Sequence, residues 1–423
     1  MGTEINLTVG GIVIDWAKND PGRDHGFLFQ PCDLARRHSD QADYEYCAEH
    51  PEVDLSLEEE SLARPLAATL PRLNLAGWTR DKARYEYNAL LAEQAEFAEE
   101  IEQTASKLLT FEEFCELVSR YPLKTLDDTY LNYEPELDLK IKERFRADQV
   151  DMDRLPDSQD SLYWSVKSYF ASKVCVLSPY SMLQVFGLCE SNNNAEVIWQ
   201  YGPLVAAGWA NISAFKSGTN RSQTILVATE GTTDSRILKH ALAILRPDIS
   251  DFFKFVDVDE RHPFWGTGNL VKFAEGLVRI DIQNKVMFIL DNDAEGVDAL
   301  RRLEQLDMPD NMRTMLLPDL DAFRAFPTID PEGAYTSDIN GRAAAIECYL
   351  DLRLPNYGLP LVRWSNYKKD VDAWHGSLEH KETYMRHFLN QTPEMLRSDG
   401  YDTTKLESVL DAITTQAVLL QHE

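Results

Sequence analysis

The sequence predicts an α/β fold, a parallel sheet covered by helices, between residues 220 and 325 of a 423-residue chain. Two observations predict it. Short apolar runs alternate in this segment with stretches whose apolar residues recur at helical spacing. Strands that alternate with helices in this way form parallel sheets. Two of the runs end on acidic residues, at the sheet edge where open parallel sheets bind their ligands.

The segments before residue 220 are predicted from shorter patterns. Residues 1–80 are expected to form an α+β region, because "NLTVGGIVIDW" has β-branched residues around a Gly-Gly turn that is typical of a hairpin. Within it, residues 45–63 are acidic and indicate a loop. Residues 81–215 are expected to be mainly helical, since "ARYEYNALLAEQAEFAEE" carries apolar residues at helical spacing. The polar stretch "FKSGTNRSQ" (215–223) indicates a linker into the α/β segment.

The α/β segment itself divides into seven elements and is followed by a C-terminal extension. The extension, residues 326–423, is expected to be mainly helical, with a turn-rich break at "RLPNYGLPL", and to complete the site of the α/β segment. The predicted strands cover 224–229, 253–258, 285–290 and 313–318, and the predicted helices cover 233–246, 268–279 and 294–306.

Composition limits the function. The chain carries 42 basic and 70 acidic residues, a net charge of −28, and should repel nucleic acid at long range. A role on DNA or RNA therefore requires a local basic patch, bound metal ions, a homo-oligomer that pools its patches, or a partner protein. The candidate patch residues are Arg301, Arg302, Arg313, Lys368, Lys369 and Lys381.

Cellular location is predicted from what the sequence lacks. Its six cysteines are scattered without a CxxC pair, which favours a reducing cytoplasm over a disulfide framework or a zinc ribbon. We find no signal-peptide pattern and no run of about 18 apolar residues, so neither secretion nor a membrane span is expected.

The acidic strand ends are the candidate site. In "TILVATEGTTDSRILKHAL" (224–242) Glu230 follows the first strand, and in "KVMFILDNDAEGVDALRRL" (285–303) Asp291 and Asp293 follow the third. If these strands are neighbours, three carboxylates converge. Asp234 either caps the helix after Glu230 or joins the same group. The alternative interpretation is that all four are caps and turn formers.

Converging carboxylates have a chemical consequence. Like charges at short range raise each other's pKa, so that the group is stable in the ionised form only around a cation. Hard oxygen ligands select Mg²⁺ or Mn²⁺. Such a centre suits phosphodiester hydrolysis, in which metal ions activate water and stabilise the leaving oxygen.

The paired motifs "EGTTDSRIL" and "DNDAEG" resemble the Toprim domain of topoisomerases, primases and certain nucleases, over roughly residues 220–325. The ExxxD form, and "GTGN" before a helix, are more similar to the nuclease branch that includes the overcoming-lysogenization-defect proteins. That resemblance implies catalytic roles for Glu230, Asp291, Asp293 and Lys381, the last in "HGSLEHKETY". It implies metal ligands at Glu230, Asp234, Asp291, Asp293 and, in "AAAIECYL", Glu347. The alternatives for Glu347 and Lys381 are a surface helix carboxylate and an exposed lysine.

The flanking segments resemble a further group. "LTVGGIVIDW", "LSPYSMLQVFGL" and "WHGSLEHK" are similar to bacterial Toprim proteins grouped as HEPN/Toprim-associated. This resemblance implies a setting of bacterial conflict with phages or plasmids. No RxxxxH-type motif of an active HEPN ribonuclease is present, because the spacing from Arg236 to His240 is wrong.

The leading hypothesis is a metal-dependent nuclease acting on DNA or RNA. Its rivals are a non-catalytic module that binds nucleic acid or a partner, and a primase-like nucleotidyl transferase. No GxxxxGK[ST] motif occurs, so an ATPase of the same system would be a partner protein. "HPFWGTGN" (262–269) is interpreted as a loop rather than a phosphate site. His262, His375 and His380 are interpreted as surface residues rather than metal ligands.

Overall fold

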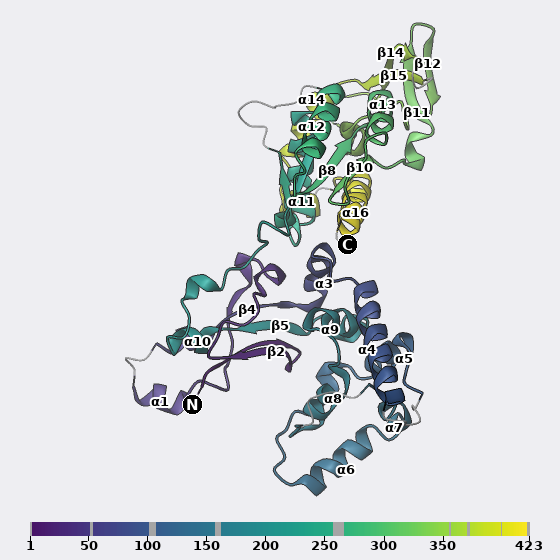
Figure 1. Ribbon diagram of the computed structural model, residues 1–423. Coiled ribbons are helices and arrows are strands. Elements are labelled where there is room, and N and C mark those ends of the chain that lie inside the picture. Colours follow the sequence, from purple (N-terminus) through teal and green to yellow (C-terminus); the bar gives the residue numbers. More distant parts are fainter. Residues whose placement is uncertain are drawn as a thin grey trace. The chain divides into compact units, whose positions relative to one another are not determined.

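The computed structural model describes residues 2–50, 54–100, 107–156, 162–256, 266–354, 357–369, 373–398 and 400–420. The chain forms two compact units, Met1–Thr219 and Asn220–Glu423 (Figure 1). The division falls inside the polar stretch expected to be a linker.

The N-terminal unit contains a five-stranded antiparallel sheet with the order β2-β1-β5-β4-β3. The predicted hairpin is confirmed: Gly10 and Gly11 have φ angles of 55° and 85° and join its two strands. A two-residue turn with both φ angles positive matches the twist of the flanking strands and favours glycine. The strands are β1 (Glu4–Val9), β2 (Ile12–Lys18), β3 (Leu34–Arg36), β4 (Glu60–Pro65) and β5 (Glu196–Gln200).

Strand β5 changes the predicted division of this unit. It lies between β1 and β4, so residues from the expected α+β region and from the expected helical region share one sheet. The described part of the acidic segment 45–63 is also mostly not a loop, because it contains helix and strand residues. Asp43 and Asp54 accept hydrogen bonds from the amides of Tyr46 and Ser56, and so begin two short helices. Acidic side chains at these positions are helix caps.

Helices pack against this sheet, and the stretch "ARYEYNALLAEQAEFAEE", which was expected to be helical, lies in α4. All residues of α9 are buried, so this segment is core. The α-helices are α1 (Tyr44–Glu49), α2 (Leu55–Glu58), α3 (Leu66–Leu75), α4 (Arg80–Glu100), α5 (Phe111–Ser119), α6 (Glu134–Arg144), α7 (Gln149–Met152), α8 (Val166–Val174), α9 (Pro179–Phe186) and α10 (Gly202–Ala206).

The C-terminal unit begins with the predicted parallel sheet. Its order is β10-β8-β6-β7, and every neighbouring pair is parallel. The chain steps from β6 outward to β7 and then back past β6 to β8, so right-handed crossovers put α11 and α12 on opposite faces. The elements are β6 (Ile225–Thr229), α11 (Thr232–Leu245), β7 (Phe253–Phe255), α12 (Thr267–Arg279), β8 (Lys285–Leu290), α13 (Ala294–Leu303) and β10 (Met312–Leu316).

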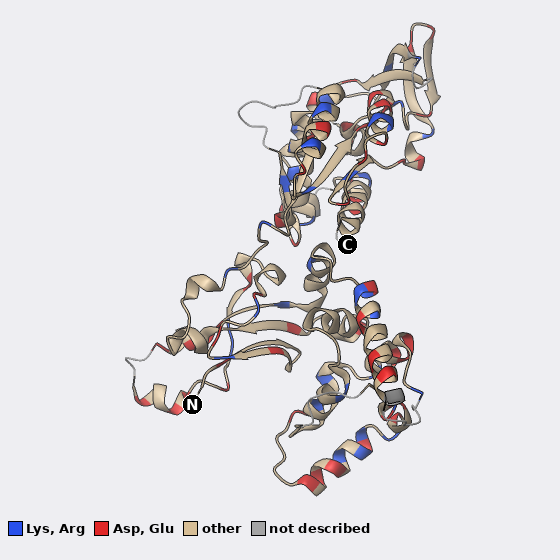
Figure 2. Ribbon diagram, viewed as in Figure 1, with Lys and Arg blue, Asp and Glu red and all other residues tan. Residues whose placement is uncertain are grey.

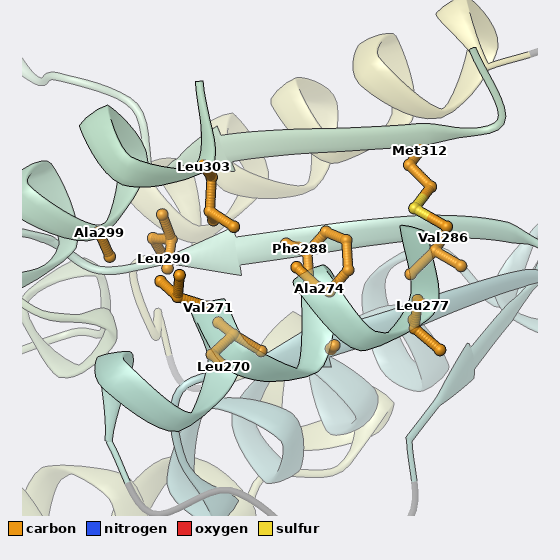
Figure 3. Close-up of a cluster of buried hydrophobic side chains, with 11 residues drawn as sticks. Leu270, Val271, Ala274, Leu277, Val286, Phe288, Leu290, Ala299, Leu303 and Met312 are labelled. Atoms are coloured by element: carbon orange, nitrogen blue, oxygen red, sulfur yellow. The ribbon is translucent and has the colours of Figure 1, made fainter. Parts of the chain in front are cut away.

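The core of this unit lies between the sheet and helices α12 and α13 (Figure 3). Phe288 and Leu290 of β8 are fully buried there against Leu270 and Ala274 of α12. Burial of one such large apolar side chain stabilises the fold by about 1.5–3 kcal/mol. This packing fixes β8, and with it the acidic residues that follow the strand.

The prediction that residues 326–423 are mainly helical is wrong for the first half of that extension. A second, mixed sheet forms there with the order β12-β11-β14-β15. Four of the five residues of β12 are exposed, so the strand lacks the apolar alternation that reveals strands in a sequence. The elements are β11 (Phe326–Asp330), β12 (Gly333–Ser337), β13 (Ala343–Ala344), β14 (Val362–Lys368), β15 (Ala373–Leu378), α14 (Lys381–Leu389), α15 (Pro393–Ser398) and α16 (Thr404–Leu419).

Among the residues that the structure describes, no helix has the length and apolar character needed to cross a membrane.

Candidate functional site

The two acidic strand ends meet. β6 and β8 are hydrogen-bonded neighbours, and the residues that follow them lie side by side at their carboxyl ends. The backbone amide of Asp291 donates to Glu230 Oε1 over 3.0 Å. The first acidic motif is therefore bonded directly to the second, as their positions after neighbouring parallel strands predict.

Asp293 is held by the start of the next helix. It is the N-cap of α13, and its Oδ1 accepts hydrogen bonds of 2.8 Å from the amides of Glu295 and Gly296. Glycine is needed at position 296 because a side chain would not fit there, and not because of its φ angle. A Cβ at Gly296 would lie 2.0 Å from the carbonyl oxygen of Asp291, far inside van der Waals contact.

A segment of the C-terminal extension is bonded to the same motif. The two-residue strand β9 (Asn292–Asp293) pairs with β13, so that Ala343 lies opposite Asp293. Two residues after β13, the amide of Ile346 donates to Asp291 Oδ1 over 2.9 Å. The extension therefore contributes directly to the architecture of the acidic site.

Glu347 follows in a 3-10 turn and is only 4% exposed. The interpretation of Glu347 as a surface helix carboxylate is thus wrong. Its charge acts on both Asp234 and Asp291, which places it within electrostatic range of the strand-end carboxylates. We call Glu230, Asp234, Asp291, Asp293 and Glu347 the acidic cluster.

Asp234 does not cap α11 in the usual position. The N-cap is Gly231, and Asp234 is the third helical residue, whose Oδ2 accepts a 2.8 Å hydrogen bond from the Gly231 amide. Lys381, the first residue of α14, is exposed, and its charge opposes the rise in the Asp234 pKa. The structure thus brings Asp234, Glu347 and Lys381 together from three separate segments.

Burial raises the pKa of four carboxylates of the cluster, Glu230, Asp234, Asp291 and Asp293. Burial raises the pKa of Glu230 and of Asp291 well above the usual values, and neighbouring carboxylates raise both further. Burial, followed by the charge of Glu347, raises the pKa of Asp234 to about 7. The hydrogen bond from the Gly231 amide and the charge of Lys381 act in the opposite direction and lower this pKa. Burial also raises the pKa of Asp293, whereas the Gly296 amide and His375 lower it. Buried like charges of this kind favour either protonation or a bound cation.

His375 is a site residue that sequence reasoning missed. It was expected at the surface, yet its ring is mostly buried and its Nδ1 lies 3.8 Å from Asp293 Oδ2. Strand β15 carries it to the cluster through contacts with β13 and α13. The only sequence signal was its place in "WHGSLEHK", beside Lys381. His380, in contrast, is exposed, as expected.

The donor set fits a hard divalent cation by its chemistry, because it consists of carboxylate oxygens in a partly buried site. Four members of the cluster each use an oxygen to accept a backbone hydrogen bond. In the part of the chain that the structure describes, no three Asp, Glu, His or Cys side chains are already arranged to hold a metal ion. The side chains would have to close around the cation on binding.

Two of the candidate patch residues interact with other parts of the C-terminal unit. Arg302 pairs with Asp298, and Arg313 donates to the carbonyl oxygen of Leu419. The side chain of Lys368 lies outside the described part. The first half of "HPFWGTGN", residues 262–265 with His262, also lies outside it, whereas Gly266 is the N-cap of α12 and the residues after it begin that helix.

Fold and site together define a class of protein: an antiparallel N-terminal unit joined to a parallel α/β unit with an acidic cluster at its strand ends. The family follows from comparison with known proteins. The chain belongs to the HEPN/Toprim N-terminal domain 1 family, whose model matches residues 1–223. This match confirms the HEPN/Toprim-associated resemblance. Searches of curated proteins and of solved structures found no similar protein.

Proposed function

We propose that the protein is a metal-dependent nuclease of Toprim type, similar to the overcoming-lysogenization-defect nucleases, and that its C-terminal unit hydrolyses phosphodiester bonds. The observation that carries the proposal is the hydrogen bond from the Asp291 amide to Glu230, which joins two acidic motifs at the ends of neighbouring parallel strands. The family match of the N-terminal unit supports the proposal, since membership of a HEPN/Toprim family suggests nuclease activity.

The proposed roles follow from position and charge. Glu230, Asp291 and Asp293 would hold Mg²⁺ or Mn²⁺, with Asp234 and Glu347 completing the negative charge around it. The bound metal would supply an activated water and stabilise the leaving oxygen. Glu230 would act either as one of these metal ligands or as the base that accepts the proton of that water.

Lys381 has a complementary role in this proposal. It is a cation on the first turn of α14, close enough to Asp234 for their charges to interact. A phosphate that entered the cluster would bring further negative charge, and the Lys381 ammonium would offset part of it. Lys381 is therefore proposed to stabilise the charge that develops on the phosphate during cleavage.

The biological setting is proposed from the family and the resemblance. We infer a cytoplasmic effector of bacterial defence against phages or plasmids. A net charge of −28 disfavours tight binding of nucleic acid by the free chain, so a homo-oligomer, or a partner ATPase or sensor, would regulate access.

The decisive test is a cleavage assay on the purified chain. Labelled single- and double-stranded DNA and RNA are incubated with Mg²⁺, with Mn²⁺ and with a chelator. We expect cleavage of at least one substrate with a divalent metal and none with the chelator. Lack of cleavage of all four substrates by a demonstrated oligomer in either metal contradicts the proposal.

A second candidate function is a non-catalytic module that binds nucleic acid or a partner protein. One observation favours it: no ready three-ligand arrangement exists among the described residues. Such a module would bind labelled strands equally well with and without a divalent metal, and it would cleave none of them.

A further inference from the structure

A second feature of the C-terminal unit is a pocket of about 800 Å³ at the edge of the parallel sheet. It wraps around β7, the short edge strand, and reaches α11 on one face and Phe273 of α12 on the other. Its volume is in the usual range for ligand sites. Phe253, Phe255 and Phe273 give it an apolar floor.

Three cations line this pocket. Arg236 and Lys239 come from the exposed side of α11, and Lys254 comes from β7. Among the residues that the structure describes, none of the three has an ion-pair or hydrogen-bond partner. One carboxylate, Asp251, also lines the pocket, so the three cations outnumber the acidic groups among its lining residues. The chain as a whole is strongly acidic, and Figure 2 colours its basic and acidic residues.

Exposed cations elsewhere in this unit are commonly paired. Arg279 pairs with Glu275, Arg324 pairs with Asp321, and Arg386 pairs with Glu382. These pairs neutralise their own surface locally. The pocket cations have no such partner within the part of the chain that the structure describes, so they can attract an anionic ligand.

The pocket adjoins the acidic cluster. Ser235 lines it, and the Ser235 hydroxyl lies 2.7 Å from that of Thr229, the residue before Glu230. The first turn of α11 thus carries Asp234 into the cluster and, two residues later, Arg236 into the pocket. A ligand that occupies the pocket has one end beside the strand ends where cleavage is proposed.

We propose that this pocket binds single-stranded nucleic acid and leads its backbone to the acidic cluster. The proposal rests on the proposed function and specifies its substrate. The three cations contact successive phosphates, while the phenylalanine floor receives an unstacked base. Sites for single strands combine a positively charged groove with aromatic side chains in this way. A duplex keeps its bases stacked inside and cannot use the apolar floor.

The test is strand binding by the full chain, measured separately from cleavage. A labelled single-stranded oligonucleotide is titrated in low salt with Ca²⁺, which should support binding without hydrolysis. The test variant combines Arg236→Gln, Lys239→Gln and Lys254→Gln. The control combines Arg279→Gln, Arg324→Gln and Arg386→Gln, and removes the same charge from exposed, paired positions.

We expect the test variant to bind at least about ten-fold more weakly, and the slope of log K against log salt to fall by about 2, for three phosphate contacts at about 0.7 each. The control should stay close to the parent. Circular dichroism verifies the fold of both, and exposed positions tolerate such changes.

Four results would overturn the inference: no binding by the parent, equal binding by test variant and parent, equal affinity for a duplex, or equal affinity for a free mononucleotide. A parent that binds strands through the pocket but cleaves nothing in Mg²⁺ or Mn²⁺ contradicts only the proposed function. A parent that cleaves, with a test variant that binds and cleaves equally well, contradicts only the pocket.

Discussion

His375 Nδ1 lies 3.8 Å from Asp293 Oδ2, in contact with the acidic cluster from a strand more than 80 residues further along the chain. Its Nδ1 is buried and has no hydrogen-bond partner among the described residues. Asp293 meanwhile uses its other oxygen to cap α13. A small movement of either side chain would join them, so His375 is placed to orient the free oxygen of Asp293.

The first prediction is that His375→Ala weakens Mn²⁺ binding by about ten-fold, because residues that orient metal ligands typically contribute ten- to a hundred-fold to affinity. Calorimetric titration measures it. His387→Ala, which removes a half-buried histidine of α14 whose ring lies 5.8 Å from that of Tyr401, is the control and should leave affinity unchanged. If the two variants bind Mn²⁺ with equal affinity, His375 has only a packing role.

The second prediction concerns the metal itself. Asp291→Asn with Asp293→Asn should weaken Mn²⁺ binding by more than ten-fold, because two charged oxygen ligands are lost while each amide keeps an oxygen for its backbone hydrogen bond. The control is Asp307→Asn with Asp310→Asn, two exposed carboxylates before β10. Unchanged affinity in the first variant would show that the metal binds elsewhere.

The third prediction is that Glu230→Gln lowers the cleavage rate by at least about a hundred-fold, the usual contribution of a base or ligand at the reacting centre. The substitution keeps the oxygen that accepts from the Asp291 amide, so the fold should persist. Initial rates are compared with those of Glu304→Gln, an exposed position at the end of α13. A Glu230→Gln variant as fast as the parent places the chemistry at other residues.

The fourth prediction concerns pH. The Asp234 pKa is about 7 in the folded protein against an ordinary 3.8, so the folded state holds this proton more tightly than the unfolded state does. The resulting stabilisation is complete below the ordinary pKa and is lost as pH rises through about 7. In metal-free buffer, Asp234→Asn should therefore gain stability relative to the parent as pH rises from about 4 to about 7.

Urea unfolding in a chelator at several pH values measures this difference. Mn²⁺ should reduce it, because a bound cation stabilises the ionised cluster of the parent. A difference in unfolding free energy that does not change with pH would show that Asp234 has an ordinary pKa in the folded protein.

The fifth prediction tests the close approach of Gly296 to the carbonyl oxygen of Asp291. Gly296→Ala should destabilise the C-terminal unit by about 1–3 kcal/mol or more, because the new Cβ would overlap the carbonyl oxygen of Asp291. Gly276→Ala on α12 is the control: nothing lies within 4 Å of its Cβ position, and alanine there should stabilise by about 0.5–1 kcal/mol. Equal stability of the two variants would contradict the packing described.

The parallel sheet was predictable from sequence because its signals are local. Apolar runs such as "KVMFIL" (285–290) form β8 with the same bounds, and the helices after Glu230 and Asp293 begin within a residue of their expected positions. A buried parallel strand is apolar on both faces, so its composition reveals it without knowledge of its partners. The acidic residues after β6 and β8 are conspicuous for the same reason.

The sheet of the C-terminal extension was not predictable in this way. Strand β12 is mostly exposed, and β14 and β15 mix aromatic residues with Asn, Ser and Gly. The sequences of such segments show neither the two-residue period of a strand nor the 3.6-residue period of a helix. These strands form because they pair with other strands, and the sequence of each strand alone does not reveal its partner.

The sequence by itself therefore determined the parallel sheet, the order of its elements and the position of Glu230, Asp291 and Asp293 at its strand ends. Only the tertiary structure decided that β13 pairs with the Asp291–Asp293 motif, that Glu347 is buried beside it, and that His375 contacts Asp293. The physical reason is the range of the interactions. The apolar patterns of buried strands and amphipathic helices arise from residues that are near neighbours in sequence. The pairing of β9 with β13, in contrast, joins segments about 50 residues apart and depends on the packing of the whole unit.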